Sequence, residues 1–112
     1  MKNILITGAA GYIGSMLCTK FVEEGYKVTA VDILKYEKNS LGHLFSRKNF
    51  LFFKLDITKK NNLKKIILNQ DFIIPLAALV GAPLCEKRKK EAIKVNVDSI
   101  KLILSLVKKR QK

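Results

Sequence analysis

The amino-acid sequence predicts an α/β domain built on a doubly wound parallel sheet of about four strands in the order 3-2-1-4, with helices on both faces. Two observations lead to this prediction. Short apolar runs typical of buried strands alternate with helical patterns across short connections. In addition, a glycine-rich turn at residues 7–14 joins the first apolar run to the first helical pattern, and an aspartate ends the second run.

The glycine-rich turn follows the strand-like run Ile4-Leu5-Ile6 and reads Thr7-Gly8-Ala9-Ala10-Gly11-Tyr12-Ile13-Gly14. Gly8 permits a tight turn, Gly11 lets the backbone approach a pyrophosphate, and Gly14 lets the new helix pack close to the strand. The first amides of that helix and its positive dipole end then face the anion. Three glycines at this spacing also occur as a purely structural bend, so the surrounding elements have to support the interpretation.

Those elements come next along the chain. A helix is predicted after the turn, and its apolar face is expected to carry Ile13, Met16, Leu17 and Phe21. Gly25 ends this helix. The run from Val28 to Val31 is the second strand, and Asp32 follows it roughly 20 residues after the motif, where a carboxylate recognises a ribose.

The segment 33–49 has no sustained period and is predicted to be mostly loop with one short helical turn. The run from Phe50 to Leu55 is the third strand, expected to be buried on both faces because it is almost continuously apolar. It ends at Asp56-Ile57.

Thr58 is the predicted cap of the next helix, which ends at Asn69 or Gln70. The apolar stripe of this helix is made of Leu63, Ile66 and Ile67. The fourth strand is Asp71–Ile74, with Pro75 and then Leu76-Ala77-Ala78 at its carboxyl end. Strand order 3-2-1-4 places a ligand crevice between the carboxyl ends of strands one and four.

A last helix is predicted over residues 87–109, and it carries two apolar stripes. One stripe comprises Ala92, Val95, Leu102, Ile103 and Leu106, and the other comprises Ile93, Val97, Ile100, Leu104 and Val107. One stripe packs on the sheet, and the second needs either more of the same chain or another subunit.

Composition and length indicate one domain, residues 1–112, with a formal net charge of +13. Such a charge is typical of nucleic-acid binding, yet 19 of the 22 basic residues are lysines scattered along the chain, which counts against it.

The sequence shows neither a secretory signal nor an apolar run of the ~20 residues that a spanning helix needs, so a cytoplasmic protein is expected. Cys18 and Cys85 are expected to be free thiols without metal-binding spacing.

These motifs resemble the extended short-chain dehydrogenase/reductase family, the NAD-dependent epimerases and dehydratases of nucleotide sugars. The resemblance runs from about residue 3 to 110 and covers only the first half of such an enzyme. It rests on the glycine motif, Asp32, Asp56-Ile57, Leu76-Ala77-Ala78 and Asn96. It implies a Rossmann-type fold truncated before the substrate-binding part, NAD as cofactor, a nucleotide-sugar substrate, and a homodimer formed through the 87–109 helix.

By this resemblance the dinucleotide contacts are Gly8, Gly11, Tyr12, Ile13, Gly14, Asp32, Asp56, Ile57, Leu76, Ala77, Ala78 and Asn96. Asp56 meets the adenine amino group and Ile57 contributes its backbone N–H. Asp56 is also compatible with a capping or turn aspartate, and Asn96 with an exposed helix position. Asp32 accepts hydrogen bonds from ribose hydroxyls and repels a 2′-phosphate, which favours NAD over NADP. Pro75 departs from the family pattern.

The family's catalytic tyrosine is followed four residues later by a lysine. In this chain Tyr12, Tyr26 and Tyr36 are followed at that spacing by Met16, Ala30 and Ser40. The general acid and base are therefore not in residues 1–112. The leading hypothesis is the NAD-binding part of an enzyme, and the alternatives are a noncatalytic dinucleotide-binding or interaction module and a basic nucleic-acid binder.

Overall fold

The computed structural model describes residues 2–33, 40–57, 59–76, 97 and 99–112. Its elements, in chain order, are β1 (Asn3–Thr7), α1 (Tyr12–Glu23), β2 (Lys27–Asp32), the 3-10 turn η1 (Gly42–Leu44), β3 (Phe50–Lys54), α2 (Lys60–Ile67), β4 (Phe72–Pro75) and α5 (Ser99–Leu106). The strands form one sheet in the order β3-β2-β1-β4, and every pairing is parallel. The predicted fold class and strand order are confirmed.

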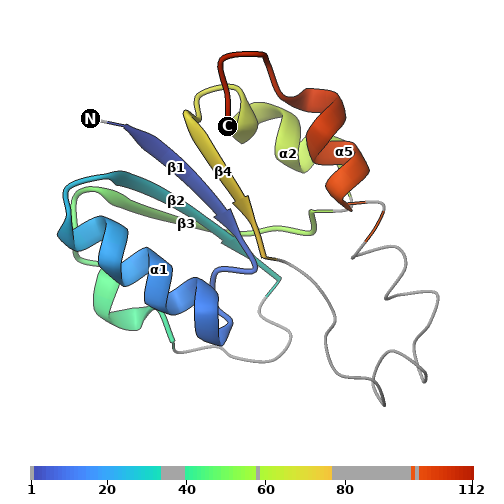
Figure 1. Ribbon diagram of the computed structural model, residues 1–112. Helices are drawn as coiled ribbons and strands as arrows, with labels where there is room; N and C mark the ends of the chain where they lie inside the picture. Colours follow the sequence, from blue (N-terminus) through green and yellow to red (C-terminus); the bar gives the residue numbers. More distant parts are fainter. Residues whose placement is uncertain (1, 34–39, 58, 77–96, 98) are drawn as a thin grey trace, which may run out of the picture.

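The sheet is covered on both faces, as Figure 1 shows. Helix α1 covers one face, where alternate strand residues pack with its inner side in one apolar cluster. Helices α2 and α5 cover the other face, where Leu5 of β1 and Val31 of β2 pack with Leu63, Ile67 and Ile103. β1 contributes to both clusters because successive side chains of a strand point to opposite faces. β1 and β2 are the two inner strands of the sheet.

The buried face of α1 differs from the predicted one. Gly14, Cys18 and Val22 are buried, at intervals of four residues, and Leu17 and Phe21 pack beside them. Ile13 and Met16 were expected on this face, yet they are 60% and 56% exposed. Contact between the helix and the turn at Gly14 sets this rotation, because only a residue without Cβ allows it. Gly25, at φ +91°, follows the helix end as predicted.

Strand β3 lies at an edge of the sheet, and the expectation that it is buried on both faces is wrong. Phe50 is buried on the α1 side, whereas Leu51 and Phe53, which point to the other face, are exposed. The run is apolar on both sides, but on this second face α2 and α5 lie over the half of the sheet that is away from β3 (Figure 1). The predicted helical turn in the loop before β3 is present as η1.

Helix α2 is shorter than predicted and buries the stripe that the sequence indicates. Its N-cap is Lys59, while Thr58, the predicted cap, lies outside the described residues. It ends at Ile67, with Leu68 as C-cap, instead of at Asn69 or Gln70. Leu63 and Ile67 are fully buried. Burial of each such side chain stabilises the fold by ~1.5–3 kcal/mol.

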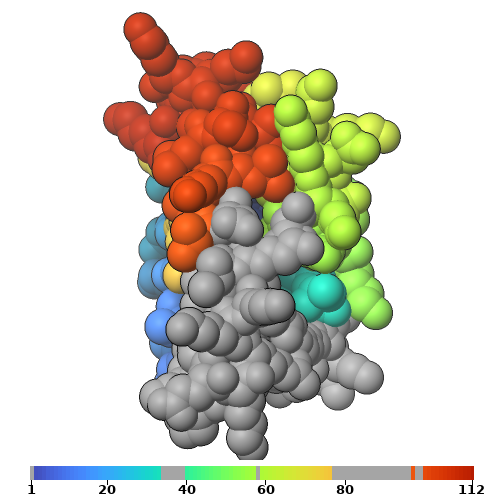
Figure 2. Space-filling view, turned by 90° about the vertical axis from the view of Figure 1, so that its right-hand side faces the viewer, coloured from blue at the N-terminus to red at the C-terminus, as the bar shows by residue number. Residues whose placement is uncertain are grey.

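Helix α5 lies against α2, as the space-filling view in Figure 2 shows for their side chains. It ends at Leu106, before the predicted Lys109, and positions 87–96 of the predicted helix lie outside the described residues. The first predicted stripe is on the inner side, with Ile103 buried and Leu102 and Leu106 packed beside it. No helix within the described part of the chain is long and apolar enough to cross a membrane.

The end of the chain runs along the outer edge of β4 (Figure 1). Lys112 N–H donates to the Asp71 carbonyl over 3.1 Å, and Ile73 N–H donates to the Lys112 carbonyl over 2.6 Å. This is how one residue pairs with a parallel strand. By alternation along the strand Pro75 also faces this outer edge, so its missing N–H costs no hydrogen bond with β1.

Candidate functional site

The candidate site is the turn between β1 and α1, at the carboxyl end of the sheet. Gly8 adopts φ +68°, a left-handed conformation that glycine adopts without strain. A Cβ at position 14 would lie 2.4 Å from the Gly8 carbonyl oxygen and 2.8 Å from Ala9 Cα. The predicted roles of these two glycines, a tight turn and close helix packing, agree with this geometry.

Gly11 belongs to the same motif, but neither its backbone conformation nor its neighbours require a glycine. As the N-cap of α1 it has φ −73°, which any residue adopts, and a Cβ there would meet the Gly8 carbonyl oxygen at an acceptable 3.4 Å. Gly11 is also exposed. The fold therefore does not require glycine at position 11, and a side chain there would occupy space outside the loop.

Main-chain hydrogen bonds fix the shape of the loop. Ala9 N–H donates to the Val31 carbonyl over 3.2 Å, and Gly11 N–H donates to the Gly8 carbonyl over 3.2 Å. Within α1 the first bond runs from Ser15 N–H to the Gly11 carbonyl. The amides of Tyr12 and Ile13 precede it and have no acceptor within the helix. They are the backbone groups that a helix N-terminus offers to an anion, while both side chains point to solvent.

Asp32, the last residue of β2, is tied directly to this loop. Its Oδ2 accepts a hydrogen bond from Ala10 N–H at 2.9 Å. A carboxylate beside the first turn of α1 is also favoured by the helix dipole. The structure thus brings the predicted ribose-binding carboxylate to the predicted phosphate-binding turn, although the two are 22 residues apart in the chain.

The connection from β2 to β3 contributes a residue that the sequence did not single out for the loop. Ser40 Oγ donates to the Ala10 carbonyl over 2.6 Å. In the sequence Ser40 stands out only as the residue four positions after Tyr36. A single serine in an irregular polar segment does not reveal this contact, because the contact depends on how the chain folds.

The remaining predicted contacts are placed only in part. Asp56 follows β3 and is half-buried, and its backbone carbonyl accepts hydrogen bonds from Lys59 N–H and Asn62 Nδ2, both at 3.1 Å. Ile57 is buried in the α2 cluster. Leu76 follows β4 and donates its N–H to the Thr7 carbonyl over 3.0 Å, which joins the ends of β4 and β1. Ala77, Ala78 and Asn96 lie outside the described residues.

Cys18 does not add chemistry to the site. Burial raises the pKa of its thiol from 9.0 to about 12. At neutral pH this lowers the thiolate fraction by about 1000-fold, since each pKa unit is a factor of ten. Cys85 lies outside the described residues. A surface hollow of about 610 Å³ beside Ser15, Thr19 and His43 is lined by none of the predicted contact residues.

Comparison with known proteins identifies the family. The sequence model of the NAD dependent epimerase/dehydratase family matches residues 4–112. The chain belongs to this family. NAD, the cofactor predicted from the sequence, is the one on which the family depends by its description. The turn after β1 and Asp32 at the end of β2 are the parts of this family member that are predicted from the sequence to bind the dinucleotide.

Relatives of known activity are about three times as long. The UDP-N-acetyl-alpha-D-glucosaminuronate decarboxylase of Bacillus cytotoxicus is 33% identical over 111 residues, which are 99% of this chain and 34% of that protein. The UDP-N-acetylglucosamine 4-epimerase of Methanobrevibacter ruminantium, solved with UDP-N-acetylmuramic acid, is 29% identical with a TM-score of 0.82 and covers 93% of this chain and 33% of its own. The chain spans about a third of these relatives.

A third relative was solved with the cofactor. The dTDP-glucose 4,6-dehydratase of Bacillus anthracis, in complex with NAD, is 29% identical with a TM-score of 0.82. The likeness covers 97% of this chain and 34% of that one. The predicted resemblance to nucleotide-sugar epimerases and dehydratases is confirmed, but the chain matches about the first third of such an enzyme and not its first half.

Proposed function

We propose that residues 1–112 form one NAD(H)-binding domain, the cofactor-binding part of a nucleotide-sugar epimerase, dehydratase or related oxidoreductase. The observation that carries this proposal is the 2.9 Å hydrogen bond from Ala10 N–H to Asp32. It places the ribose-recognising carboxylate against the glycine turn. The pyrophosphate meets the amides of Tyr12 and Ile13, and Gly11 leaves room for its approach.

The other predicted residues complete the contacts of this domain. We expect Asp56 and Ile57 to recognise the adenine, the segment 76–78 to contact the pyrophosphate and ribose, and Asn96 to face the same cleft. A carboxylate at Asp32 accepts hydrogen bonds from both ribose hydroxyls and repels the 2′-phosphate of NADP, so NAD is the preferred cofactor.

The test is a calorimetric titration of the chain with NAD⁺. Asp32→Asn removes the negative charge that favours ribose hydroxyls, and it is expected to weaken NAD⁺ binding by about tenfold, the value of one lost charge-assisted hydrogen bond. The same substitution lowers the preference for NAD⁺ over NADP⁺, because it removes the repulsion of the 2′-phosphate.

Asp71→Asn is the matched control. The Asp71 carboxylate also accepts a backbone N–H, from Asn3 at 2.8 Å, but it lies at the amino end of the sheet. Asp71→Asn is expected to leave NAD⁺ affinity unchanged in the folded protein. Failure of the unmodified chain to bind NAD⁺ overturns the proposal, and equal losses in the two variants overturn the role of Asp32.

The proposed chemistry of the enzyme needs a tyrosine followed four residues later by a lysine, and residues 1–112 contain no such pair. Hydride transfer to or from a nucleotide sugar is therefore proposed for a protein in which this domain works together with such a catalytic part. A noncatalytic dinucleotide-binding module is the second candidate, since the dinucleotide contacts proposed above need no catalytic residue. The two are separated by following the sugar product with a panel of UDP- and dTDP-sugars, since only the enzyme converts the sugar.

We also propose a homodimer through α5, in a cytoplasmic protein without a nucleic-acid role. Leu104 is 66% exposed on α5 and Val97, just before the helix, is also exposed. Both belong to the predicted second stripe. Leu104→Lys is expected to shift a dimer to monomer in sedimentation velocity, while Ser105→Ala on the same helix is not. A monomeric unmodified chain contradicts the dimer, and salt-dependent DNA binding contradicts the absence of a nucleic-acid role.

A further inference from the structure

The β2–β3 connection is packed against the glycine turn by several independent contacts in the segment 40–44. Leu41 and Leu44 are buried in the same apolar cluster as Ala9 and Ala10. Ser40 Oγ–H donates to the Ala10 carbonyl at 2.6 Å. The segment therefore covers the turn with apolar side chains and also makes a directed hydrogen bond to it.

A second polar contact holds the same segment on α1. His43 Nε2 and Thr19 Oγ1 are 2.8 Å apart, and Thr19 Oγ1 donates its single proton to the Ser15 carbonyl at 2.9 Å. With that proton committed, His43 Nε2 is the donor to the threonine oxygen. The segment is thus attached at both ends, by Ser40 to the turn and by His43 to the helix that follows it.

The buried Ala10 carbonyl receives its hydrogen-bond donor from Ser40. Ala10 is buried, and its carbonyl precedes the first helical acceptor, which is the Gly11 carbonyl. A buried carbonyl without a donor is destabilising, and Ser40 supplies one. The peptide between Ala10 and Gly11 is then held at both of its polar atoms, because Gly11 N–H donates to the Gly8 carbonyl.

We infer that Ser40 is a positioning residue for the dinucleotide loop. It fixes the direction of the Ala10–Gly11 peptide, immediately before the Tyr12 and Ile13 amides that face the anion. Without the serine hydroxyl this peptide rotates more freely, and a carbonyl oxygen that turns toward the site repels a phosphate. This inference rests on the proposed NAD-binding function, although the restraint itself exists without a ligand.

The experiment compares Ser40→Ala with a serine that is matched in geometry. Ser105 Oγ also donates to a backbone carbonyl at 2.6 Å, that of Leu102, on the far helix α5. Ser40→Ala is expected to raise the Kd for NAD⁺ by about tenfold, because the variant loses one hydrogen bond that holds the loop in its binding conformation before the ligand arrives. Ser105→Ala is expected to leave it unchanged. Ser40→Thr keeps the hydroxyl and restores binding to within about threefold of the unmodified chain.

A second readout needs no ligand. The Gly11 amide in the Ser40→Ala variant is expected to exchange with solvent deuterium about tenfold faster, whereas the amides of β1 keep their rates. A purely structural role of Ser40 would lower Tm and speed exchange throughout the domain, with unchanged Kd for the molecules that remain folded. That outcome overturns the inference.

The two readouts also separate this inference from the proposed function. If the unmodified chain does not bind NAD⁺, the proposed function fails, and faster Gly11 exchange in Ser40→Ala still supports the restraint on the loop. If Ser40→Ala weakens NAD⁺ binding with unchanged Gly11 exchange, the serine touches the ligand directly, and the positioning role is overturned.

Discussion

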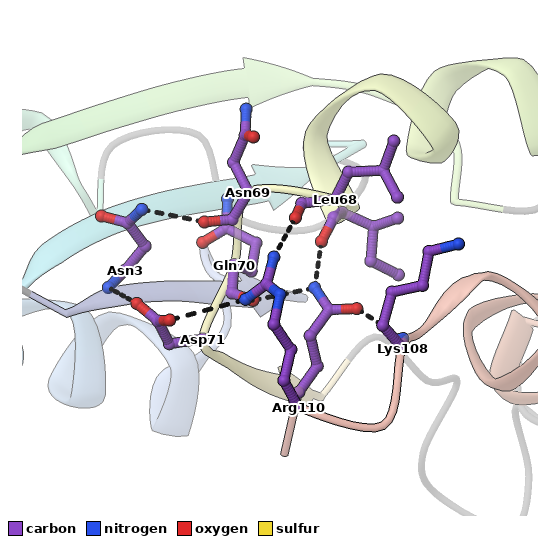
Figure 3. A network of polar contacts seen from close by, with 9 residues as sticks. Asn3, Leu68, Asn69, Gln70, Asp71, Lys108 and Arg110 are labelled. Atoms are coloured by element: carbon purple, nitrogen blue, oxygen red, sulfur yellow. Dashed lines mark hydrogen bonds and ion pairs between the residues drawn. The ribbon is translucent and has the colours of Figure 1, made fainter.

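The two ends of the sheet are held by different kinds of contact. At the carboxyl end, the turn after β1 is shaped mainly by backbone groups, with Asp32 and Ser40 each adding one side-chain hydrogen bond at Ala10. At the amino end, side chains form a network of polar contacts, which Figure 3 shows. There Asp71 accepts from Asn3 N–H, and Arg110 donates to the Leu68 carbonyl at 2.6 Å.

The difference lies in what each end leaves for a ligand. At the amino end, Gln111 donates from its amide to the carbonyls of Ile67 and Gln70, and its Oε1 accepts from Lys108 N–H (Figure 3). These side chains satisfy carbonyls that α2 leaves at its C-terminus. At the carboxyl end, the first amides of α1 remain outside the helical bonding. The contacts at the amino end therefore stabilise the fold, whereas the carboxyl end leaves backbone amides that we propose bind an anion.

The largest effect is expected from Gly14→Ala, because the new Cβ would collide with atoms of Gly8 and Ala9 that belong to the backbone, so the turn or the helix would have to shift. The free energy of unfolding should fall by about 3 kcal/mol, the upper part of the range for overpacking. Urea denaturation followed by circular dichroism measures it. Gly42→Ala is the control, since a Cβ there meets nothing within 4 Å. Equal stability of the two variants would contradict the role of close packing at Gly14.

A smaller effect is expected at the opposite end from Gln111→Ala. The substitution removes both amide donors from the end of α2 and should cost about 2 kcal/mol of unfolding free energy. NAD⁺ affinity, measured where the variant is fully folded, should stay unchanged. Lys112→Ala serves as control because that side chain is exposed. A loss of NAD⁺ affinity in Gln111→Ala would show that the two ends are coupled and would break the comparison.

Much of the carboxyl end was predictable from the sequence. The glycine spacing and the position of Asp32 carry steric and chemical requirements that leave few alternatives, and the roles of Gly8 and Gly14 follow from them. Ser40 was not identified, because its contact joins two loops 30 residues apart and depends on how the segment packs. The amino-end network was missed for the same reason, since Arg110 and Gln111 read only as part of a polar chain end.

The fold was predictable in its order and less so in its burial. Alternating elements determine a parallel sheet, whereas the rotation of α1 depends on one close contact at Gly14 that periodicity does not report. The apolar run of β3 likewise indicates a buried strand, but exposure of Leu51 and Phe53 depends on which half of the sheet the helices cover. Local pattern gives the element, and tertiary packing decides its buried face.

The smallest effect on stability is expected from Gly11→Ala, and this makes it the sharpest test of the carboxyl end. Its backbone and surroundings accept a methyl group, so the free energy of unfolding should fall only by the roughly 0.5–1 kcal/mol by which alanine is a poorer N-cap than glycine. NAD⁺ affinity should nevertheless fall by at least about tenfold, because the methyl group occupies the path by which the pyrophosphate approaches the backbone. Calorimetric titration beside the denaturation curve separates the two quantities. Unchanged affinity would mean that the phosphate does not come close to Gly11. Neither the fold nor cofactor binding would then explain why position 11 is a glycine.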